Sequence, residues 1–173
     1  MTSPMTGKRI YSTRQLAAYG LPALPLAAIM MPVYIFLPTF YAQSLGIGMA
    51  SVGIVRLIAG IWDIITDPIV GILGDHTRSA YGRRKIWIAA GLPITMLGTW
   101  MLLAPPGDAG ALHMLIWSAV MYLGWTAMIL PLSAWGAELS DDYDERSRIA
   151  AWREGFVVAG TLITLALVAA LGF

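Results

Sequence analysis

Long apolar stretches alternate along the chain with short polar segments. The apolar stretches lie at about 16–42, 49–75, 86–104, 111–138 and 149–173. Each is near or above the roughly 20 residues that a membrane-spanning helix needs. The polar segments between them are short and rich in turn-forming residues, namely QSLGIG, HTRSAYGRRK, PPGDAG and SDDYDERSR. A soluble helical bundle would show a polar face along each helix, and these stretches have none. The pattern therefore predicts an all-α membrane protein with five spanning helices.

Composition agrees with this setting and narrows the function. Hydrophobic residues make up 58% of the chain and charged residues only 12%, with a mean hydropathy of +0.70, whereas about 25% of the residues in a soluble domain are charged. The absence of cysteine excludes a disulfide framework and a thiolate metal site. The charges form no nucleic-acid-binding surface. We find no nucleophile–base pair, phosphate loop or metal-ligand cluster, so the sequence gives no support for an enzyme.

The basic residues gather in alternate polar segments: before the first apolar stretch, between the second and third, and before the fifth. They are Lys8, Arg9, Arg14, Arg78, Arg83, Arg84, Lys85, Arg146 and Arg148. Because cytoplasmic loops are enriched in Lys and Arg, we expect residues 1–15 to form a cytoplasmic N-terminus and residues 16–173 a helix bundle that ends on the opposite face. The last stretch reaches Phe173 with no polar flank, which suggests a truncated chain.

Two carboxylates, Asp63 and Asp67, interrupt the second apolar stretch one helical turn apart. If the basic loop near Asp75 marks the membrane surface, a rise of 1.5 Å per residue places Asp67 about 12 Å and Asp63 about 18 Å above it. That depth is close to the middle of a hydrocarbon core about 30 Å thick. An ionisable group there is costly unless it is paired, hydrated or protonated, so the pair predicts an ion or proton site.

The helical wheel strengthens this hypothesis. Arg56, Asp63 and Asp67 project from one face of the predicted helix. Pro68 has no N–H to bond the carbonyl of Ile64, which leaves that oxygen available beside the two carboxylates. Such oxygen ligands suit a hard cation, Na⁺ if the protein is sodium-coupled. The alternative is that arginines on neighbouring helices simply neutralise both acids.

The loop after the second stretch has two possible roles. Its charged residues are Asp75, Arg78, Arg83 and Arg84. Their contacts can latch one conformation of the protein at the cytoplasmic face, with the arginines pairing with acids. Alternatively, the basic residues serve only as a topology signal. We also expect Gly71 and Gly74 to allow close helix packing.

Two long motifs resemble one known family. D-x-x-x-D-P-x-x-G-x-x-x-D-x-x-R-x-x-x-G-R-R-K begins at Asp63, and PLSAWGAELSDDYDERSRIAAWR begins at Pro131. Both are similar to segments of the glycoside–pentoside–hexuronide:cation symporters of the major facilitator superfamily. The resemblance implies the first five of the twelve helices of that fold. It also implies Na⁺ or H⁺ symport of a sugar, glycoside or related small solute across a bacterial-type inner membrane.

The resemblance also suggests roles for particular residues. Asp63, Asp67 and Thr126 correspond to the family's cation site, and Arg153 to an arginine near its sugar site. Trp125 is a further candidate for substrate contact, by stacking on a sugar ring. At the cytoplasmic junction, Glu138 and Arg146 are expected to act in gating or in ion pairs there.

The same alignment shows where the chain departs from the family. The family's sugar-binding acids are replaced, by Leu21–Pro22 in the first helix and by Ile129 in the fourth. An arginine that stands one turn before the first cation-site acid is replaced by Gly60, and Arg56 lies one turn earlier still. Recognition of the solute is therefore expected to differ more from the family than coupling to the cation.

The sequence thus predicts the N-terminal part of a cation-coupled transporter, with no cofactor beyond the coupling ion. Its expected partners are the lipid bilayer, a small solute and the missing half or a separately encoded membrane protein. Two alternatives remain open. One is a non-transporting scaffold or assembly subunit, although a scaffold gains nothing from the costly acids Asp63 and Asp67. The other is a lysolipid transporter of the same superfamily.

Overall fold

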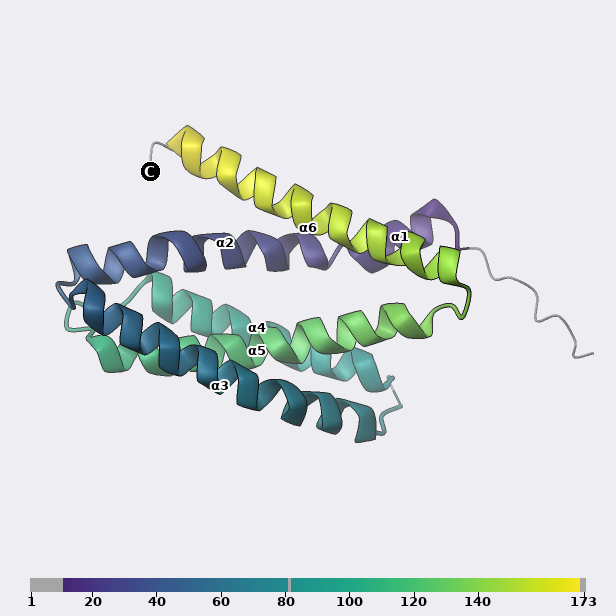
Figure 1. The fold of residues 1–173 in the computed structure, drawn as a ribbon, viewed down its shortest axis with the longest axis horizontal. Coiled ribbons are helices and arrows are strands. Elements are labelled where there is room, and N and C mark those ends of the chain that lie inside the picture. Colours follow the sequence, from purple (N-terminus) through teal and green to yellow (C-terminus); the bar gives the residue numbers. More distant parts are fainter. Residues whose placement is uncertain (1–10, 81, 172–173) are drawn as a thin grey trace, which may run out of the picture. The chain divides into compact units, whose positions relative to one another are not determined.

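The computed structural model describes residues 11–80 and 82–171. Its helices are α1 (Thr13–Gly20), α2 (Ala23–Thr39), the short π-helix η1 (Phe40–Ser44), α3 (Met49–His76), α4 (Arg83–Leu103), α5 (Ala111–Glu138) and α6 (Tyr143–Leu171) (Figure 1). Five helical segments among the described residues are long and apolar enough to cross a membrane, with α1, α2 and η1 together forming the first. Lys8 and Arg9 of the predicted cytoplasmic N-terminus lie outside the described residues, as do residues 172–173.

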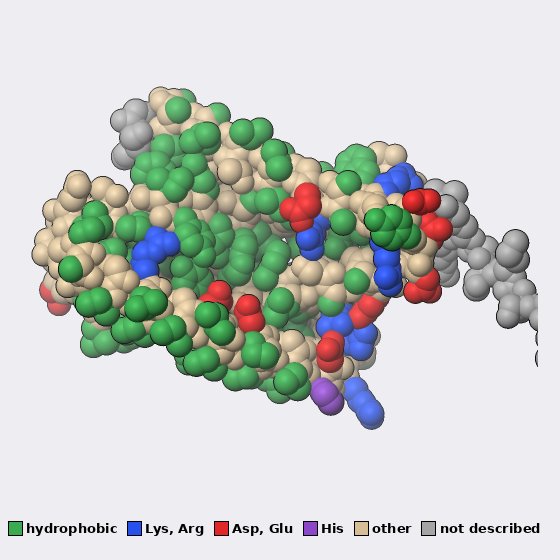
Figure 2. Space-filling view, in the orientation of Figure 1, with side chains coloured by type: hydrophobic (Ala, Val, Ile, Leu, Met, Phe, Trp, Pro, Cys, Tyr) green, Lys and Arg blue, Asp and Glu red, His purple; other side chains and the backbone are tan. Residues whose placement is uncertain are grey.

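The side chains on the helix surfaces are those of a lipid-facing protein. Large apolar residues of α3 are exposed along its length, among them Leu57 (66%), Ile64 (73%) and Ile72 (60%). In Figure 2, hydrophobic side chains are spread over the face that is shown, and charged side chains lie in a few places. A helix that is apolar on its exposed sides is stable only against protein or lipid.

The helices form two compact units. One contains the described residues of Met1–Ala28 and Trp135–Phe173, and the other is Ile29–Ala134. Each unit is described below by itself.

In the first unit, α1 packs along α6. A capping box begins α1, since the Gln15 N–H donates to the Ser12 hydroxyl and the Ser12 N–H donates to the Gln15 side chain. At the other end of α6, the Thr164 hydroxyl donates to the Gly160 carbonyl within the helix and lies 3.4 Å from the Ala28 carbonyl. A side chain at Gly160 would collide with the carbonyl of Leu24, so α6 and the start of α2 approach closely there.

The second unit has an apolar core formed by side chains from α2, η1, α3, α4 and α5. Its members include Val33, Leu37, Tyr41, Val52, Val55, Ala59, Leu102, Met114, Met121 and Tyr122. Two polar contacts fix the helices around this core. The fully buried Tyr41 donates its hydroxyl to the Leu102 carbonyl at 3.2 Å, and Trp62 donates its indole N–H to the Ala119 carbonyl at 3.1 Å. The second bond joins α3 to α5 close to Asp63.

Two differences from the predicted helices have a local cause. The first predicted helix breaks at Leu21–Pro22, where proline cannot donate the next helical hydrogen bond. The last helix begins at Tyr143 rather than near residue 149. Asp142 caps it, with its side chain accepting the Glu145 N–H at 3.0 Å, so the polar segment before residue 149 forms the first turns of α6.

The close packing predicted for Gly71 and Gly74 is absent from the described part of the chain. A Cβ at Gly71 would meet nothing within 4 Å, and at Gly74 it would make only ordinary contacts. The close approach occurs instead between α4 and α5. A Cβ at Gly98 would lie 2.8 Å from the Met121 backbone, and one at Gly124 would lie 2.5 Å from the Thr95 nitrogen.

Candidate functional site: a paired carboxylate between two helices

Asp63 and Asp67 meet the same side chain of α5. The Thr126 hydroxyl lies 3.1 Å from Asp63 Oδ1 and 2.9 Å from Asp67 Oδ1. One turn of α3 separates the two acids, so their side chains leave the helix on one face. Thr126 is 1% exposed, and both acids are partly buried. The structure thus brings together the three residues that the sequence predicts as a cation site.

The shared hydroxyl leaves this site short of positive charge. A threonine hydroxyl has one proton and can donate fully to one acceptor. Two carboxylate oxygens therefore compete for a single hydrogen, and the carboxylates repel each other across it. A bound cation, or a proton on one carboxyl group, removes both problems.

Arginine does not neutralise the pair within Ile29–Ala134. In that described unit, neither Asp63 nor Asp67 forms an ion pair with a lysine or arginine. Arg56, on the same face of α3, donates instead to the Tyr34 carbonyl at 3.0 Å. The alternative that neighbouring arginines neutralise both acids therefore finds no support in this unit.

The donor set suits a hard monovalent cation or a proton. Carboxylate and hydroxyl oxygens are hard ligands, of the kind that alkali and alkaline-earth cations prefer. Among the described residues, no three His, Cys, Asp or Glu side chains gather into a metal-ligand cluster.

The two residues predicted to contact substrate lie in different units. Trp125 is half-buried on α5, next to Thr126 in the chain but turned about 100° from it around the helix. Arg153, on α6, forms an ion pair with Glu154 at 2.5 Å. Each keeps its predicted role as a proposal.

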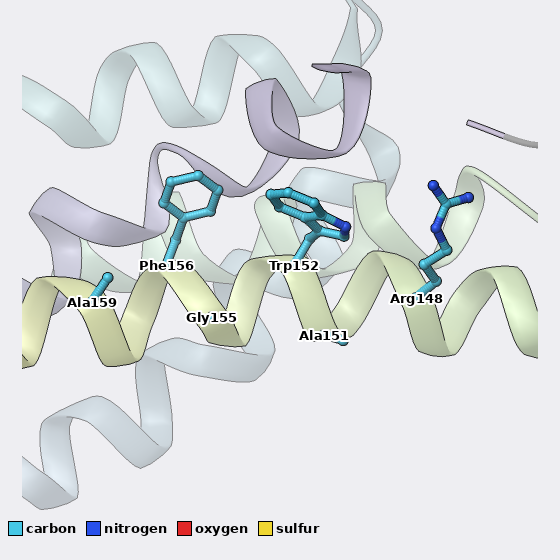
Figure 3. A pocket seen from close by; sticks show the side chains of 6 residues that line it. All are labelled: Arg148, Ala151, Trp152, Gly155, Phe156 and Ala159. Carbon is cyan, nitrogen blue, oxygen red and sulfur yellow. The ribbon is translucent and has the colours of Figure 1, made fainter. Parts of the chain in front are cut away.

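A pocket of about 400 Å³ lies along α6 and contains two aromatic rings (Figure 3). Its lining residues are Arg148, Ala151, Trp152, Gly155, Phe156 and Ala159. The rings of Trp152 and Phe156 have centroids 6.3 Å apart. Glu145, only 4% exposed, holds Arg148 at 3.2 Å and accepts the Tyr11 N–H at 2.8 Å. Sequence reasoning did not single out Glu145 or Phe156, although Glu145 stands in the acidic and basic run of the second motif.

Of the loop residues predicted to act as a gate, Asp75 and Arg84 form an ion pair at 2.8 Å. The pair lies beside a pocket of about 240 Å³, whose other lining residues are Val70, Gly71, Gly74, Leu130, Pro131 and Ala134. Arg78 and Arg83 are exposed.

The other two residues predicted to act as a gate belong to the first unit. Glu138 is exposed at the end of α5. Arg146 donates to the Ser140 carbonyl at 2.6 Å and lies 3.9 Å from Asp141. Its observed contacts therefore hold the α5–α6 turn.

Fold and site together define a multi-pass helical membrane protein with two acids inside a spanning helix. The family model for MFS/sugar transport proteins matches residues 18–173, so the chain belongs to that family. This confirms the resemblance inferred from the two motifs and the predicted fold class. The family consists of transport proteins, and the expectation that the chain is not an enzyme is confirmed on that ground.

Similar proteins include several symporters. An uncharacterised symporter of Synechocystis is 31% identical over 96% of this chain and 32% of its own length. An Escherichia coli inner membrane symporter, YicJ, is 28% identical over 91% of the chain and 35% of its own length. A zebrafish sodium-dependent lysophosphatidylcholine symporter is 30% identical over 66% of the chain and 22% of its own length. The chain thus spans about a third of the first two relatives.

Proposed function

We propose that the protein is part of a cation-coupled symporter, with Asp63, Asp67 and Thr126 as its site for Na⁺ or H⁺. One observation carries this proposal: a single buried hydroxyl lies between two carboxylate oxygens in a membrane-spanning helix. Charged groups at such depth are costly and are retained where they move or bind ions. The symporters among the relatives support the same class of function.

The site also suggests how the cation acts on the fold. Asp63 and Asp67 belong to α3, and Thr126 belongs to α5. A cation that neutralises the carboxylates lets α3 and α5 hold this arrangement, while their repulsion opposes it when the cation leaves. A ligand shifts a conformational equilibrium only by its difference in affinity between the states. We therefore propose that the cation favours the state in which the two helices meet here.

For the solute, we propose a sugar or glycoside, with Arg153 and Trp125 as contact residues. The family description supports a sugar. Lysophospholipid is the second candidate, because one relative is a lysophosphatidylcholine symporter. Leu21–Pro22 and Ile129 also stand where sugar-binding acids were expected.

We further propose an inner-membrane location with a cytoplasmic N-terminus. There, Asp75, Arg78, Arg83, Arg84, Glu138 and Arg146 would form the cytoplasmic gate. Helices equivalent to the rest of the relatives, on this or another polypeptide, would complete the carrier. In carriers of this kind, the solute site lies near the membrane midplane and access alternates between its two sides.

Cation-induced thermal stabilisation tests the cation site without knowledge of the solute. The natural gene product is purified in detergent and heated in Na⁺, K⁺ or choline at constant ionic strength. The measurement is repeated over a range of pH. We expect Na⁺ or protons to raise the unfolding temperature. Asp63→Asn and Asp67→Asn should abolish that response. Thr126→Val should weaken cation affinity about tenfold or more, because hydrogen bonds to charged groups contribute about 1.5–3 kcal/mol.

Asp108→Asn is the matched control, since it removes one exposed carboxylate from the loop between α4 and α5. It should respond to cations like the parent. A parent that no cation stabilises, or variants at Asp63 and Asp67 that respond like the parent, would contradict the proposed site.

A further inference from the structure

We propose that Arg56, Tyr34 and Tyr122 form a subsite for an anionic group of the ligand, a carboxylate or a phosphate. The subsite lies about two turns of α3 before the paired carboxylates. In assigning this group to the transported solute, the inference rests on the proposed function. The three residues come from α2, α3 and α5, and all three lie within the unit Ile29–Ala134.

Arg56 is a charged residue inside a spanning helix. It lies in α3, whose span is Met49–His76, and it is partly buried. Seven residues separate it from Asp63, which gives about 20° around the helix and about 10 Å along it. Its side chain thus shares a face with the cation site, two turns away. On the depth scale used for Asp63, Arg56 lies about 28 Å from the proposed cytoplasmic surface, near the far edge of a hydrocarbon core about 30 Å thick. A positive charge at that position attracts an anionic group that enters from that side.

The contacts of Arg56 leave that charge uncompensated. Nη1 donates to the Tyr34 carbonyl at 3.0 Å, and the guanidinium carbon lies 4.9 Å from the centre of the Tyr34 ring. A cation–π contact contributes about 0.5–2 kcal/mol and neutralises nothing. In the described residues of Ile29–Ala134, no Asp or Glu forms an ion pair with Arg56. The guanidinium has five N–H donors, so donors remain for a ligand.

The two tyrosines add neutral donors beside it. Tyr122 is 8% exposed, and its phenol group lies within electrostatic range of Tyr34 and Arg56. Tyr34 is 50% exposed, so this cluster is reachable from outside the core. A planar guanidinium with nearby hydroxyl donors fits carboxylate or phosphate oxygens, to which arginine binds through two parallel hydrogen bonds.

The two subsites are aligned on both helices. On α5, Tyr122 stands one turn before Thr126, as Arg56 stands two turns before Asp63 on α3. The guanidinium of Arg56 and the tyrosine hydroxyls therefore come first along the two helices, and the acids Asp63 and Asp67 come next. Figure 2 shows charged side chains of both signs set among hydrophobic ones on the face where α3 lies. This arrangement fits a ligand whose anionic end binds beside Arg56 while the coupling cation binds beside Asp63 and Asp67.

Titration calorimetry tests the subsite. It measures ligand binding to the natural gene product reconstituted in lipid nanodiscs. The carboxylate probe is methyl β-glucuronide, with methyl β-glucoside as its neutral match. The phosphate probe is lysophosphatidic acid, with a monoacylglycerol of equal chain length as its neutral match. We expect one anionic probe to bind more tightly than its match, and which one binds identifies the source of the anion.

Arg56→Gln should weaken that anionic probe at least tenfold and leave binding of its neutral match unchanged. Arg56→Lys should recover only part of the affinity. Lysine keeps the positive charge and is long enough to reach the membrane surface, but it lacks the planar guanidinium that forms two parallel hydrogen bonds. Tyr122→Phe should weaken binding several-fold. The control Arg14→Gln removes an exposed arginine from α1 and should bind like the parent.

Three results would overturn the subsite: no binding of either anionic probe, no preference over the neutral matches, or unchanged affinity in Arg56→Gln. Repeating the titration in Na⁺ and in choline, with Asp63→Asn alongside, separates this proposal from the previous one. If the anionic probe binds equally well in Na⁺ and in choline but more weakly to Arg56→Gln, the result would count against the symporter alone. If the probe binds more tightly in Na⁺ than in choline but equally well to Arg56→Gln and the parent, the result would count against the anion subsite alone.

Discussion

At the residue scale, the Asp75–Arg84 ion pair connects the end of α3 to the first turn of α4. Asp75 is 59% exposed and Arg84 is 13% exposed, so water reaches one partner. Pairs of this kind contribute up to about 1 kcal/mol. The ion pair is therefore weak enough to break and form again, and it contributes little to the stability of the fold.

The pair's role as a latch can be measured at the pocket beside it. Ala134→Cys places a thiol in the lining of that 240 Å³ pocket, and the native chain has no cysteine. If the ion pair closes the pocket, Arg84→Gln should raise the alkylation rate of this thiol in inside-out vesicles by up to about fivefold. Arg14→Gln removes an exposed arginine from α1 and should leave the rate unchanged. Equal rates for all three proteins would reduce the loop to a topology signal.

Single residues were predictable where their chemistry conflicts with the membrane. Asp63 and Asp67 stand out because carboxylates are costly in an apolar helix. Thr126 is an ordinary residue in a spanning helix, and only the family resemblance indicated it. Tyr34 and Tyr122 could not be identified from spacing, because their relation to Arg56 depends on how α2 and α5 pack against α3.

At the scale of elements, the α4–α5 crossing depends on small residues that touch backbone. A Cβ at Gly91 would lie 2.7 Å from the Gly124 carbonyl, and one at Gly98 would lie 2.8 Å from the Met121 backbone. Without a hydrophobic force between helices in lipid, such close approach supplies packing and stabilises the pair. The crossing supports Thr126, which is on α5 two residues after Gly124.

Adding one methyl group at this crossing should destabilise the protein. Gly98→Ala forces α4 and α5 apart, and overpacking of this kind costs about 1–3 kcal/mol. We expect its unfolding temperature in detergent, measured by size-exclusion chromatography after heating, to fall by several degrees. Gly53→Ala is the matched control, because a Cβ there meets nothing within 4 Å and alanine favours the helix by about 1 kcal/mol. If Gly98→Ala were as stable as Gly53→Ala, the close α4–α5 contact would be wrong.

The helices themselves follow from the sequence where hydrophobic length dominates. For α5, the predicted range 111–138 coincides with the observed bounds. The first and last helices differ because local hydrogen bonding decides them: Pro22 interrupts one and the Asp142 cap extends the other. Close-packed glycines were expected in α3 and occur in α4 and α5, since glycine content marks the possibility of close approach but not its partner.

At the scale of the whole molecule, the distribution of basic residues predicts the orientation in the membrane. The loop between α3 and α4 and the first turn of α4 contain Arg78, Arg83, Arg84 and Lys85, whereas Leu45–Gly48 and Ala104–Gly110 contain neither Lys nor Arg. Along the described helices, the segments with basic residues alternate with the loops that lack Lys and Arg. On the positive-inside rule, we propose that the α3–α4 loop lies in the cytoplasm, as does the α5–α6 turn.

Thiol labelling in intact cells tests this orientation directly. Cysteines introduced at the exposed residues Ser44 and Asp108 should react with an impermeant maleimide added outside. Cysteines at Ala80 and Asp141 should react only after the cells are permeabilised, and permeabilised cells supply the positive control. Asp141 is the better site in the α5–α6 turn, because Asp142 caps α6 and its loss would disturb the helix. Labelling at Ala80 in intact cells would reverse the orientation and move the paired Asp75 and Arg84 to the outer face. The latch experiment would then require right-side-out vesicles, whereas the cation site, at mid-membrane depth, would stand unchanged.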